Sequence, residues 1–317
     1  MAIHRRVFIG LIGAAMLAPP ARAADKIVGG TLGGQAPLWP FYVAARKGFF
    51  AGEDLDVEIN FAQSGPAVAQ QLTGGAFDVA LSIGNDNAIH AIDKGAPLAI
   101  VRIIGNTAPY ALIAKPELKT IADLKGKTIG ISVIGGGTQG PFNMLLKQNG
   151  VDPAKDIKLV EVGFAVSEDA LRQGRVDAVN MNQPFAARAE AKGGTRKLFS
   201  LNQAMPNIVH ILEACRADFV DKNPELVKAY VRDITLGMKK ALANREETLK
   251  VVSEQLKAPI PVLDTYLLKD NDFGRDPGAA PNFEAIQKML DIYTATGMLP
   301  KMDVAQFKHP TIVAPLQ

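Results

Sequence analysis

The sequence has little of the chemistry that disulfides, metal centres and nucleic-acid surfaces need. Its 317 residues include one cysteine, Cys215, so neither an intrachain disulfide nor a cysteine-ligated metal or iron–sulfur cluster can form. Four histidines are too few to favour a multi-histidine metal centre, and we expect no metal and no cofactor. Aromatic residues make up 6% of the chain, which leaves few stacking platforms for single-stranded nucleic acid.

The first 23 residues have the three-part layout of a secretory signal peptide. Arg5 and Arg6 form a basic head, residues 7–18 are an apolar run, and Ala21-Arg22-Ala23 offers the small residues of a cleavage site. The run of 12 residues is shorter than the ~20 needed to span a membrane. We therefore expect cleavage after Ala23 and a periplasmic product. The paired arginines also resemble a twin-arginine signal, so the general and the twin-arginine export routes both stay open.

Removal of this leader changes the charge balance. Three of the 35 Lys and Arg residues lie in the leader, so the mature chain has 32 bases against 32 acids and no net formal charge. A neutral chain gives no argument for binding nucleic acid or an anionic membrane. Because no cysteine directly follows Ala23, no lipid can be attached at the cleavage site, and we expect a soluble product. We also expect a monomer.

From residue 26 onward, short β-type runs alternate with amphipathic helical windows. The predicted strands cover residues 26–32, 56–62, 77–83, 98–105, 110–114, 128–132, 158–162, 177–181 and 197–200. The predicted helices between them cover residues 39–47, 66–73, 87–94, 139–149, 167–173 and 184–192. Strand–helix alternation of this kind predicts an α/β fold with largely parallel sheets. Beyond about Arg216 the pattern changes to longer helices, at 224–244, 245–256 and 282–296, of the sort that cover a sheet.

A faint internal repeat predicts two similar lobes. Residues 72–80 (LTGGAFDVA) match residues 171–179 (LRQGRVDAV) at a constant offset of 99 residues. Both segments read as a helix end, a glycine turn and a buried strand that an aspartate, Asp78 or Asp177, precedes.

These segments carry a family likeness. The stretch APLWPFYVAARKGFF at residues 36–50, followed by LDVE at 55–58, resembles the opening of ABC-transporter solute-binding proteins of the nitrate/aliphatic-sulfonate/taurine type. Residues 72–83, 121–130 (IADLKGKTIG) and 171–179 match the same family in the same order. The resemblance implies a two-lobed periplasmic-binding-protein-like fold (type II) that closes over one small ligand and docks on a membrane permease.

The resemblance also implies where the lobes begin and end. Lobe 1 would comprise residues 24–115 and 215–317, and lobe 2 would comprise residues 116–214. The hinge would then lie near residues 114–116 and 213–216, with Cys215 as a buried free thiol.

In open parallel sheets, ligands bind beyond the carboxyl ends of the strands, so the turns that follow the strands are the candidate site. These turns hold polar and small residues and no base. The candidate ligand-binding residues are Gln35, Trp39, Ser64, Gly65, Asn85, Asp86, Gly136, Gly137, Thr138, Asn182 and Gln183. Arg102 or Arg188 could reach inward from outside these turns.

The glycine run before Thr138 follows a strand and opens a helix. Unpaired N–H groups at such a helix start suit a carboxylate, sulfonate or other oxyanion, whereas the alternative is a flexible turn. The run lacks the final G-K-[ST] of a nucleotide P-loop, which disfavours ATP. Ser64 is placed to cap the helix that Pro66 begins, a structural role that is compatible with ligand contact.

Other candidates also have two interpretations. Trp39 is either an apolar wall for the ligand or a core residue of its own lobe. The amides of Asn182 and Gln183 could donate to an anion or accept from an amine. Asp86 and His90 lack a third metal ligand, so a local contact is the simpler explanation, although Asp86 could hold an ammonium group of a zwitterionic ligand.

The leading hypothesis is a non-enzymatic receptor that delivers a small organic anion, such as a sulfonate, a nitrate-like ion or a carboxylate, to an ABC importer. The alternative is an enzyme, because the same family contains pyrimidine-precursor synthases. Their cysteine-rich motif is absent from a chain with one cysteine, and no nucleophile–base pair is evident. A sensory domain of a receptor is a third possibility, which the cleavable leader disfavours.

Overall fold

The computed structural model describes residues 25–32, 38–47, 55–105, 109–136, 138–204, 209–268, 282–307 and 309. The leader, Gln35 and Gly137 lie outside the described residues, so the expectations for them remain predictions. In the described part of the chain, no helix is both long enough and apolar enough to cross a membrane.

The first sheet has five strands in the order β2-β1-β3-β10-β4. Strand β1 runs parallel to β2 and β3, whereas β10 runs antiparallel to both of its neighbours. The strands are β1 (Asp25–Leu32), β2 (Leu55–Ala62), β3 (Val79–Gly84), β4 (Leu98–Gly105) and β10 (Ile211–Arg216). The connecting helices are α1 (Trp39–Lys47), α2 (Gly65–Thr73) and α3 (Asn85–Asp93). We call this sheet and its helices lobe 1.

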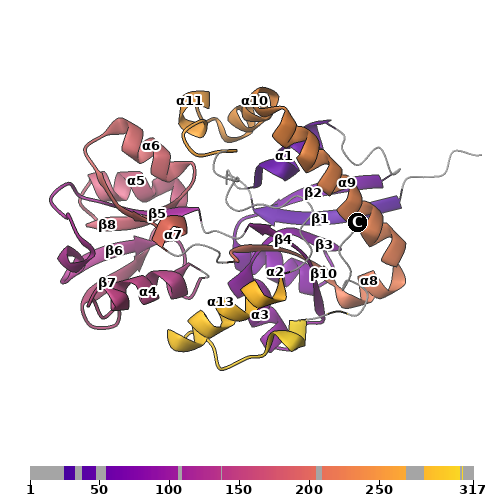
Figure 1. The fold of residues 1–317 in the computed structure, drawn as a ribbon, viewed down its shortest axis with the longest axis horizontal. Helices are drawn as coiled ribbons and strands as arrows, with labels where there is room; N and C mark the ends of the chain where they lie inside the picture. Colours follow the sequence, from indigo (N-terminus) through magenta and orange to yellow (C-terminus); the bar gives the residue numbers. More distant parts are fainter. Residues whose placement is uncertain are drawn as a thin grey trace, which may run out of the picture.

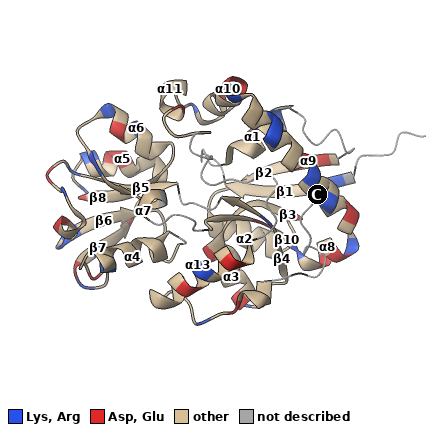
Figure 2. Ribbon diagram, in the orientation of Figure 1, with Lys and Arg blue, Asp and Glu red and all other residues tan. Residues whose placement is uncertain are grey.

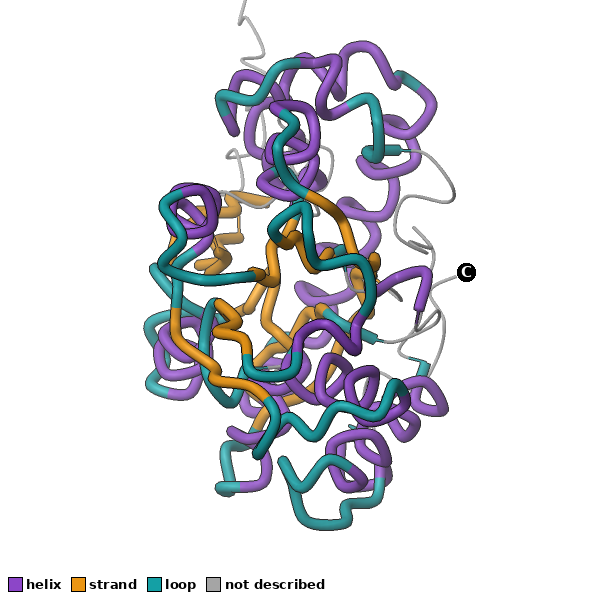
Figure 3. Tube along the Cα trace, turned by 90° about the vertical axis from the view of Figure 1, so that its left-hand side faces the viewer, coloured by secondary structure: helices purple, strands orange, loops and turns teal. Residues whose placement is uncertain are grey.

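The second sheet repeats this arrangement in the order β7-β6-β8-β5-β9. Its strands are β5 (Tyr110–Ala114), β6 (Lys127–Ile131), β7 (Ile157–Glu161), β8 (Ala178–Asn182) and β9 (Arg196–Ser200). Its helices are η3 (Ile121–Leu124), α4 (Gln139–Gln148), α5 (Phe164–Arg172), α6 (Phe185–Lys192) and α7 (Leu201–Ala204). Viewed from the side of this lobe, the strands lie between helices (Figure 3). This sheet and its helices form lobe 2.

Each sheet contains one antiparallel strand, β10 in lobe 1 and β5 in lobe 2, at the same place in the order. Both are the strands on which the chain enters one lobe from the other. A chain that arrives at the edge where the parallel strands end must run back along the sheet, so the entering strand is antiparallel. The prediction of largely parallel sheets therefore holds except for these two strands.

The crossings between the lobes lie elsewhere than the sequence predicted. Tyr110–Ala114 was expected in lobe 1 but pairs with β8 and β9, and residues 211–214 were expected in lobe 2 but pair with β3 and β4. The chain thus crosses between Gly105 and Tyr110 and again between Ala204 and Ile211. The expected hinges at 114–116 and 213–216 lie toward the carboxyl ends of β5 and β10, away from the crossings. The prediction failed because an apolar run and a proline do not reveal which sheet a strand joins.

The helices that follow β10 cover both faces of the first sheet (Figure 1). Helices α9 and α10 pack with α1 over one face, and α13 packs with α2 and α3 over the other. Helix α13 also contacts α4 of lobe 2, so it touches both lobes. The helices are α8 (Ala217–Lys222), α9 (Pro224–Ala243), α10 (Arg245–Leu256), α11 (Ile260–Leu263), α13 (Phe283–Ala295) and η4 (Val304–Phe307).

The ends of the helices follow local chemistry. Ser64 caps α2, with its hydroxyl accepting from the N–H of Ala67 at 3.3 Å, and Pro66 occupies the first turn, where no N–H is needed. Gly95 and Gly150 follow α3 and α4 with φ of +87° and +73°, as predicted for residues that end a helix in the left-handed region. Charges of both signs are spread over the outer helices and loops of both lobes (Figure 2).

Candidate functional site

A cavity of about 260 Å³ lies where the carboxyl ends of the two sets of strands face each other. Lobe 1 contributes the β2–α2 and β3–α3 turns, and lobe 2 contributes the β6–α4 and β7–α5 turns. The main lining residues are Gln63, Ser64, Gly65, Ser82, Asp86 and Asn87 from lobe 1 and Ser132, Gly136, Thr138, Gly163 and Phe164 from lobe 2. Tyr110, which begins β5, and His210, which directly precedes β10, also line it.

The two turns of lobe 1 approach each other closely. A Cβ at Gly65 would lie 2.6 Å from Nδ2 of Asn87, so a larger residue there would displace the Asn87 side chain. Ser64 and Gly65 thus present the start of α2 to the cavity, with the positive end of the helix dipole behind them. This arrangement agrees with the predicted capping role of Ser64 and leaves its hydroxyl on the cavity wall.

Asn85 does not line the cavity, but its hydrogen bonds hold neighbouring parts of the site in place. Its backbone N–H donates to the carbonyl of His210 at 3.0 Å, and its side-chain amide donates to the carbonyl of Val209. Its Oδ1 accepts from the Tyr293 hydroxyl and from the N–H of Asp86, each at 2.6 Å. Asn85 therefore ties the second crossing and α13 to the turn that carries Asp86.

Asp86 is buried and is the charged side chain among the described lining residues. Its Oδ1 accepts from Nδ2 of Asn87 at 3.1 Å. Arg102 does not reach the cavity, because it is 1% exposed and its Nε lies 3.6 Å from Glu213, beneath α9. Arg188 lies 6.0 Å from the ring centroid of Phe185 and is not a lining residue.

The glycine turn of lobe 2 differs from its prediction in one respect. The N–H of Ile134 donates to Glu161 at 2.8 Å, that of Gly135 to Oε1 of Gln139 at 2.6 Å, and that of Gly136 to the carbonyl of Val133 at 3.2 Å. The expectation of unpaired amides is therefore wrong for Gly135 and Gly136, because a neighbouring side chain and the turn itself supply acceptors. Gly136 and Thr138 do line the cavity.

Two aromatic side chains and a histidine form a wall that the sequence did not predict. The rings of Tyr110 and His210 meet edge to face with centroids 5.0 Å apart, and Phe164 lies 5.9 Å from Tyr110. Burial lowers the pKa of His210 to about 4, so its imidazole is neutral at pH 7. Burial, and then the charge of Asp86, raises the pKa of Tyr110. Tyr110 and His210 were missed because the crossings were placed elsewhere; the correct strand pairing would have indicated them.

Three other predicted residues are not among the lining residues. Trp39 is fully buried in the core of lobe 1, which agrees with the second of its two interpretations. Oε1 of Gln183 accepts from the N–H of Ala187 at 3.1 Å, at the start of α6. Asn182 is fully buried at the end of β8. Within the described ranges, no group of three or more His, Cys, Asp or Glu side chains is placed to hold a metal ion.

A wider groove of about 900 Å³ adjoins the cavity. It runs between α2, α3 and the glycine turn, with Gln70, His90 and Lys94 on its lobe 1 side. It shares Pro66, Asp86, Asn87, Val133 and Gly136 with the cavity. The groove is therefore a route from solvent to the enclosed part of the site, and Lys94 places a base at that entrance.

Known proteins resemble this chain over most of its length. It is 27% identical over 200 residues to the putative binding protein YtlA of Bacillus subtilis, and the matched region covers 62% of this chain and 60% of YtlA. It is 25% identical over 250 residues to the putative aliphatic sulfonates-binding protein of Escherichia coli, with 77% and 76% covered. The matched part thus spans about three fifths of YtlA.

Solved structures confirm the fold. The periplasmic aliphatic sulphonate binding protein SsuA of Escherichia coli superimposes with a TM-score of 0.74 at 20% identity, over 90% of this chain and 97% of that one. The predicted resemblance to periplasmic solute-binding proteins is thereby confirmed. The family model described as NMT1/THI5 like matches residues 35–248, and the chain belongs to that family.

Proposed function

We propose that this protein is the solute-binding component of an ABC importer and holds a small organic solute between its two lobes. The observation that carries the proposal is the cavity itself, which turns from both lobes enclose. A solute that touches both walls makes its full set of contacts only when the lobes are close together, so its binding favours the closed arrangement. A closed form that differs from the open form is what a membrane permease can recognise.

We infer that the solute carries an acidic group, as the sulfonate of the Escherichia coli relative's name does. The start of α2 and the hydroxyls of Ser64, Ser132 and Thr138 offer donors to such a group without a buried counter-charge. The acidic group would lie against these donors and away from Asp86. Export through the leader, a permease partner and a monomeric state in the periplasm are parts of the same proposal.

The proposal is tested by ligand binding to the mature chain, residues 24–317. A thermal-shift screen would contain taurine, ethanesulfonate, nitrate, benzoate and nicotinamide, with calorimetry and small-angle scattering on each compound that raises the melting temperature. A solute that binds only the native state raises the melting temperature, and closure lowers the radius of gyration.

Two results would contradict the proposal. One is that no compound of the screen, and no molecule that copurifies with the exported protein, binds in the cavity. Binding in the cavity is recognised by its loss in Thr138→Tyr, because the larger side chain would fill the cavity. The other is conversion of a bound compound to a product, which would identify an enzyme instead.

A further inference from the structure

Asn182 is a buried amide whose hydrogen-bonding groups have no partner. The residue ends β8 and is 0% exposed. Neither Nδ2 nor Oδ1 has a hydrogen-bond partner among the described residues. Buried side-chain amides in native proteins are almost always satisfied, so an amide that lacks both partners points to a partner outside the chain, an ordered water or a bound solute.

Strand pairing places this amide next to the cavity. Asn182 is the cross-strand partner of Tyr110, and directly opposed residues of an antiparallel pair have their side chains on the same face. Asn180 shares that face, two residues earlier on β8, and its Nδ2 lies 3.4 Å from the Thr138 hydroxyl. Tyr110 and Thr138 both line the cavity. Asn182 therefore lies at the cavity end of β8, beside two lining residues.

The chemistry of an amide restricts what can satisfy it. Nδ2 donates two hydrogen bonds and Oδ1 accepts, so a partner must present an acceptor and a donor side by side. A nitrate ion or a plain alkanesulfonate has acceptors only and would leave Oδ1 unpaired in a buried place. Asp86, on the opposite wall, is likewise an acceptor when it is ionised.

We propose that Asn182 anchors the solute in lobe 2 and selects a solute that carries an N–H or ammonium donor next to an acceptor oxygen. This inference rests on the proposed function and narrows its ligand class to acids that also carry such a donor, namely amino acids of the sulfonic or carboxylic type and acids that bear an amide or ureide group. Nitrate and unsubstituted sulfonates are excluded from that class. The aromatic wall of Tyr110, Phe164 and His210 suits a planar group of this kind.

The variant that tests the role is Asn182→Leu, which keeps the branched shape and removes both polar atoms. Because it removes an amide without partners, we expect the melting temperature of the ligand-free protein to stay the same or rise. Asn182→Ala, which cannot overpack the site, is the second variant. Asn143→Leu is the matched control, because Asn143 is also buried and has an Oδ1 without a partner, but it lies on α4 and is not the strand partner of a lining residue.

The binding arm uses two pairs of probes that share an acidic group and differ in the ammonium donor, taurine against ethanesulfonate and β-alanine against propanoate. We expect the donor-bearing member of at least one pair to bind at least tenfold more tightly than its partner. Asn182→Leu and Asn182→Ala should weaken that member at least tenfold, whereas Asn143→Leu should bind it within twofold.

The outcomes separate this inference from the proposed function. Equal binding of the acceptor-only probes, or unchanged binding by both Asn182 variants, would overturn the role of Asn182 and leave a solute-binding protein. If no probe binds, the ligand-free proteins decide: a marked fall in melting temperature for both Asn182 variants would mean that the amide has a structural partner, and the inference fails. An equal or higher melting temperature for Asn182→Leu would support it.

Discussion

Asp78 in lobe 1 and Asp177 in lobe 2 make the same contact at the same place in their sheets. Oδ2 of Asp78 accepts from the N–H of Val28, and Oδ2 of Asp177 accepts from the N–H of Thr128, each at 2.9 Å. The backbone N–H of each aspartate donates to the carbonyl of the same partner at 2.8 Å. The repeat that the sequence showed at an offset of 99 residues is thus a repeated structural device that joins adjacent parallel strands at their start.

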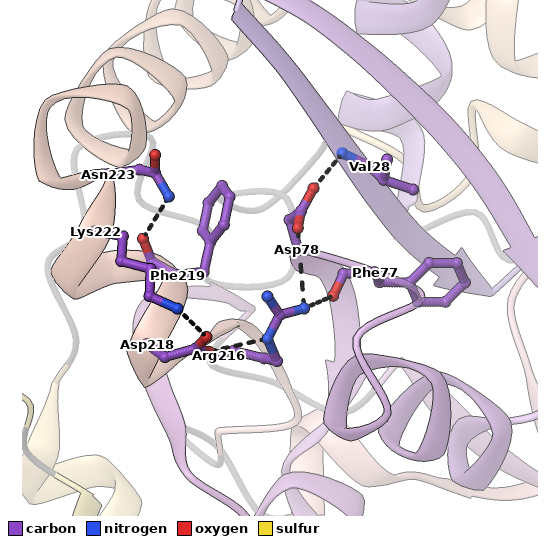
Figure 4. Close-up of polar contacts among 8 residues, drawn as sticks. All are labelled: Val28, Phe77, Asp78, Arg216, Asp218, Phe219, Lys222 and Asn223. Atoms are coloured by element: carbon purple, nitrogen blue, oxygen red, sulfur yellow. Dashed lines mark hydrogen bonds and ion pairs between the residues drawn. The ribbon is translucent and has the colours of Figure 1, made fainter.

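Each of these two aspartates also forms an ion pair with a basic side chain. Arg216 approaches Asp78 at 3.9 Å and also bonds Asp218 and the carbonyl of Phe77 (Figure 4). Lys115 lies 2.6 Å from Asp177. These contacts lie at the ends of the sheets opposite to the cavity, so they bear on stability and not on the ligand.

The first prediction is that Asp177→Ala lowers the free energy of unfolding by about 1.5–3 kcal/mol at pH 7, because a hydrogen bond to a charged acceptor is lost. Partial burial alone would raise the pKa of Asp177, but the hydrogen bonds from Lys115 and Thr128 outweigh it and lower this pKa below its ordinary value. The stabilisation is therefore present above about pH 4, the ordinary pKa of an aspartate, and is lost as the pH falls through the lower native pKa. Urea unfolding at pH 7 and pH 3 measures both effects.

Asp169→Ala, at an exposed position on α5, is the control for this substitution. Its free energy of unfolding should stay within about 0.5 kcal/mol of the parent. An equal loss in both variants, or a deficit of Asp177→Ala that is unchanged at pH 3, would show that the carboxylate is not the source of the effect.

The second prediction concerns the acid side of the stability profile. Burial lowers the pKa of His210 to about 4, whereas an unfolded histidine titrates near 6.5. Between these values the unfolded chain binds a proton that the native protein does not, so stability falls as the pH drops from about 6.5 to about 4. The loss from this residue is roughly 3 kcal/mol in total.

His210→Phe keeps a ring against Tyr110 and removes the titration, so it should flatten this part of the profile. His90→Gln is the control, since His90 is only partly buried; burial and Lys94 lower its pKa while Asp93 opposes them. Urea unfolding at half-unit steps between pH 4 and 7 compares the two. The same profile in both variants would contradict a dominant role for His210.

The third prediction separates the two roles of Ser64. Asparagine and aspartate cap helices about as well as serine, so Ser64→Asn and Ser64→Asp should unfold within about 0.5 kcal/mol of the parent, whereas Ser64→Ala should lose about 1 kcal/mol. Ser64→Asp also places a negative charge on the cavity wall near Asp86. It should weaken an acidic solute at least tenfold in calorimetry, and Ser64→Asn should not. Equal binding by both would place the acidic group elsewhere.

The sequence predicted the elements of the fold well and their assembly less well. Predicted strands and helices are present with their ends shifted by at most three residues, because apolar runs bounded by glycine and proline are local signals. Strand β10 was not predicted. Its apolar pattern is broken by Glu213, which is buried because it opposes Arg102 on β4, and that pairing is a tertiary fact.

The site likewise has a part that the sequence could predict and a part that it could not. The turns after the strands could be predicted, because the carboxyl ends of parallel strands share one edge, and Ser64, Gly65, Asp86, Gly136 and Thr138 do line the cavity. Tyr110 and His210 could not be predicted, because their place depends on which sheet receives β5 and β10. The acceptors that Glu161 and Gln139 offer to the glycine turn likewise depend on side-chain positions that no spacing reveals.

The last prediction concerns the contact between the lobes at Gly140, in the first turn of α4. A Cβ there would lie 2.6 Å from a ring carbon of Tyr293 on α13 and 3.0 Å from Sδ of Met298. Alanine in place of a helical glycine normally stabilises a helix by about 1 kcal/mol. Here we expect Gly140→Ala to push α4 away from α13, to increase the radius of gyration in scattering and to weaken the bound solute several-fold.

The contacts of Tyr293 explain why Gly140→Ala should weaken solute binding. Its hydroxyl donates to Asn85, which holds the turn of Asp86, so displacement of the ring disturbs the cavity as well as the contact between the lobes. Tyr293→Leu removes the ring that the new methyl group would strike. A double variant, Gly140→Ala with Tyr293→Leu, should therefore bind as Tyr293→Leu does, and this non-additivity identifies the clash as the cause. A loss of binding in the double variant equal to the sum of the losses in the two single variants would mean that the glycine acts through the helix and not through the lobe contact.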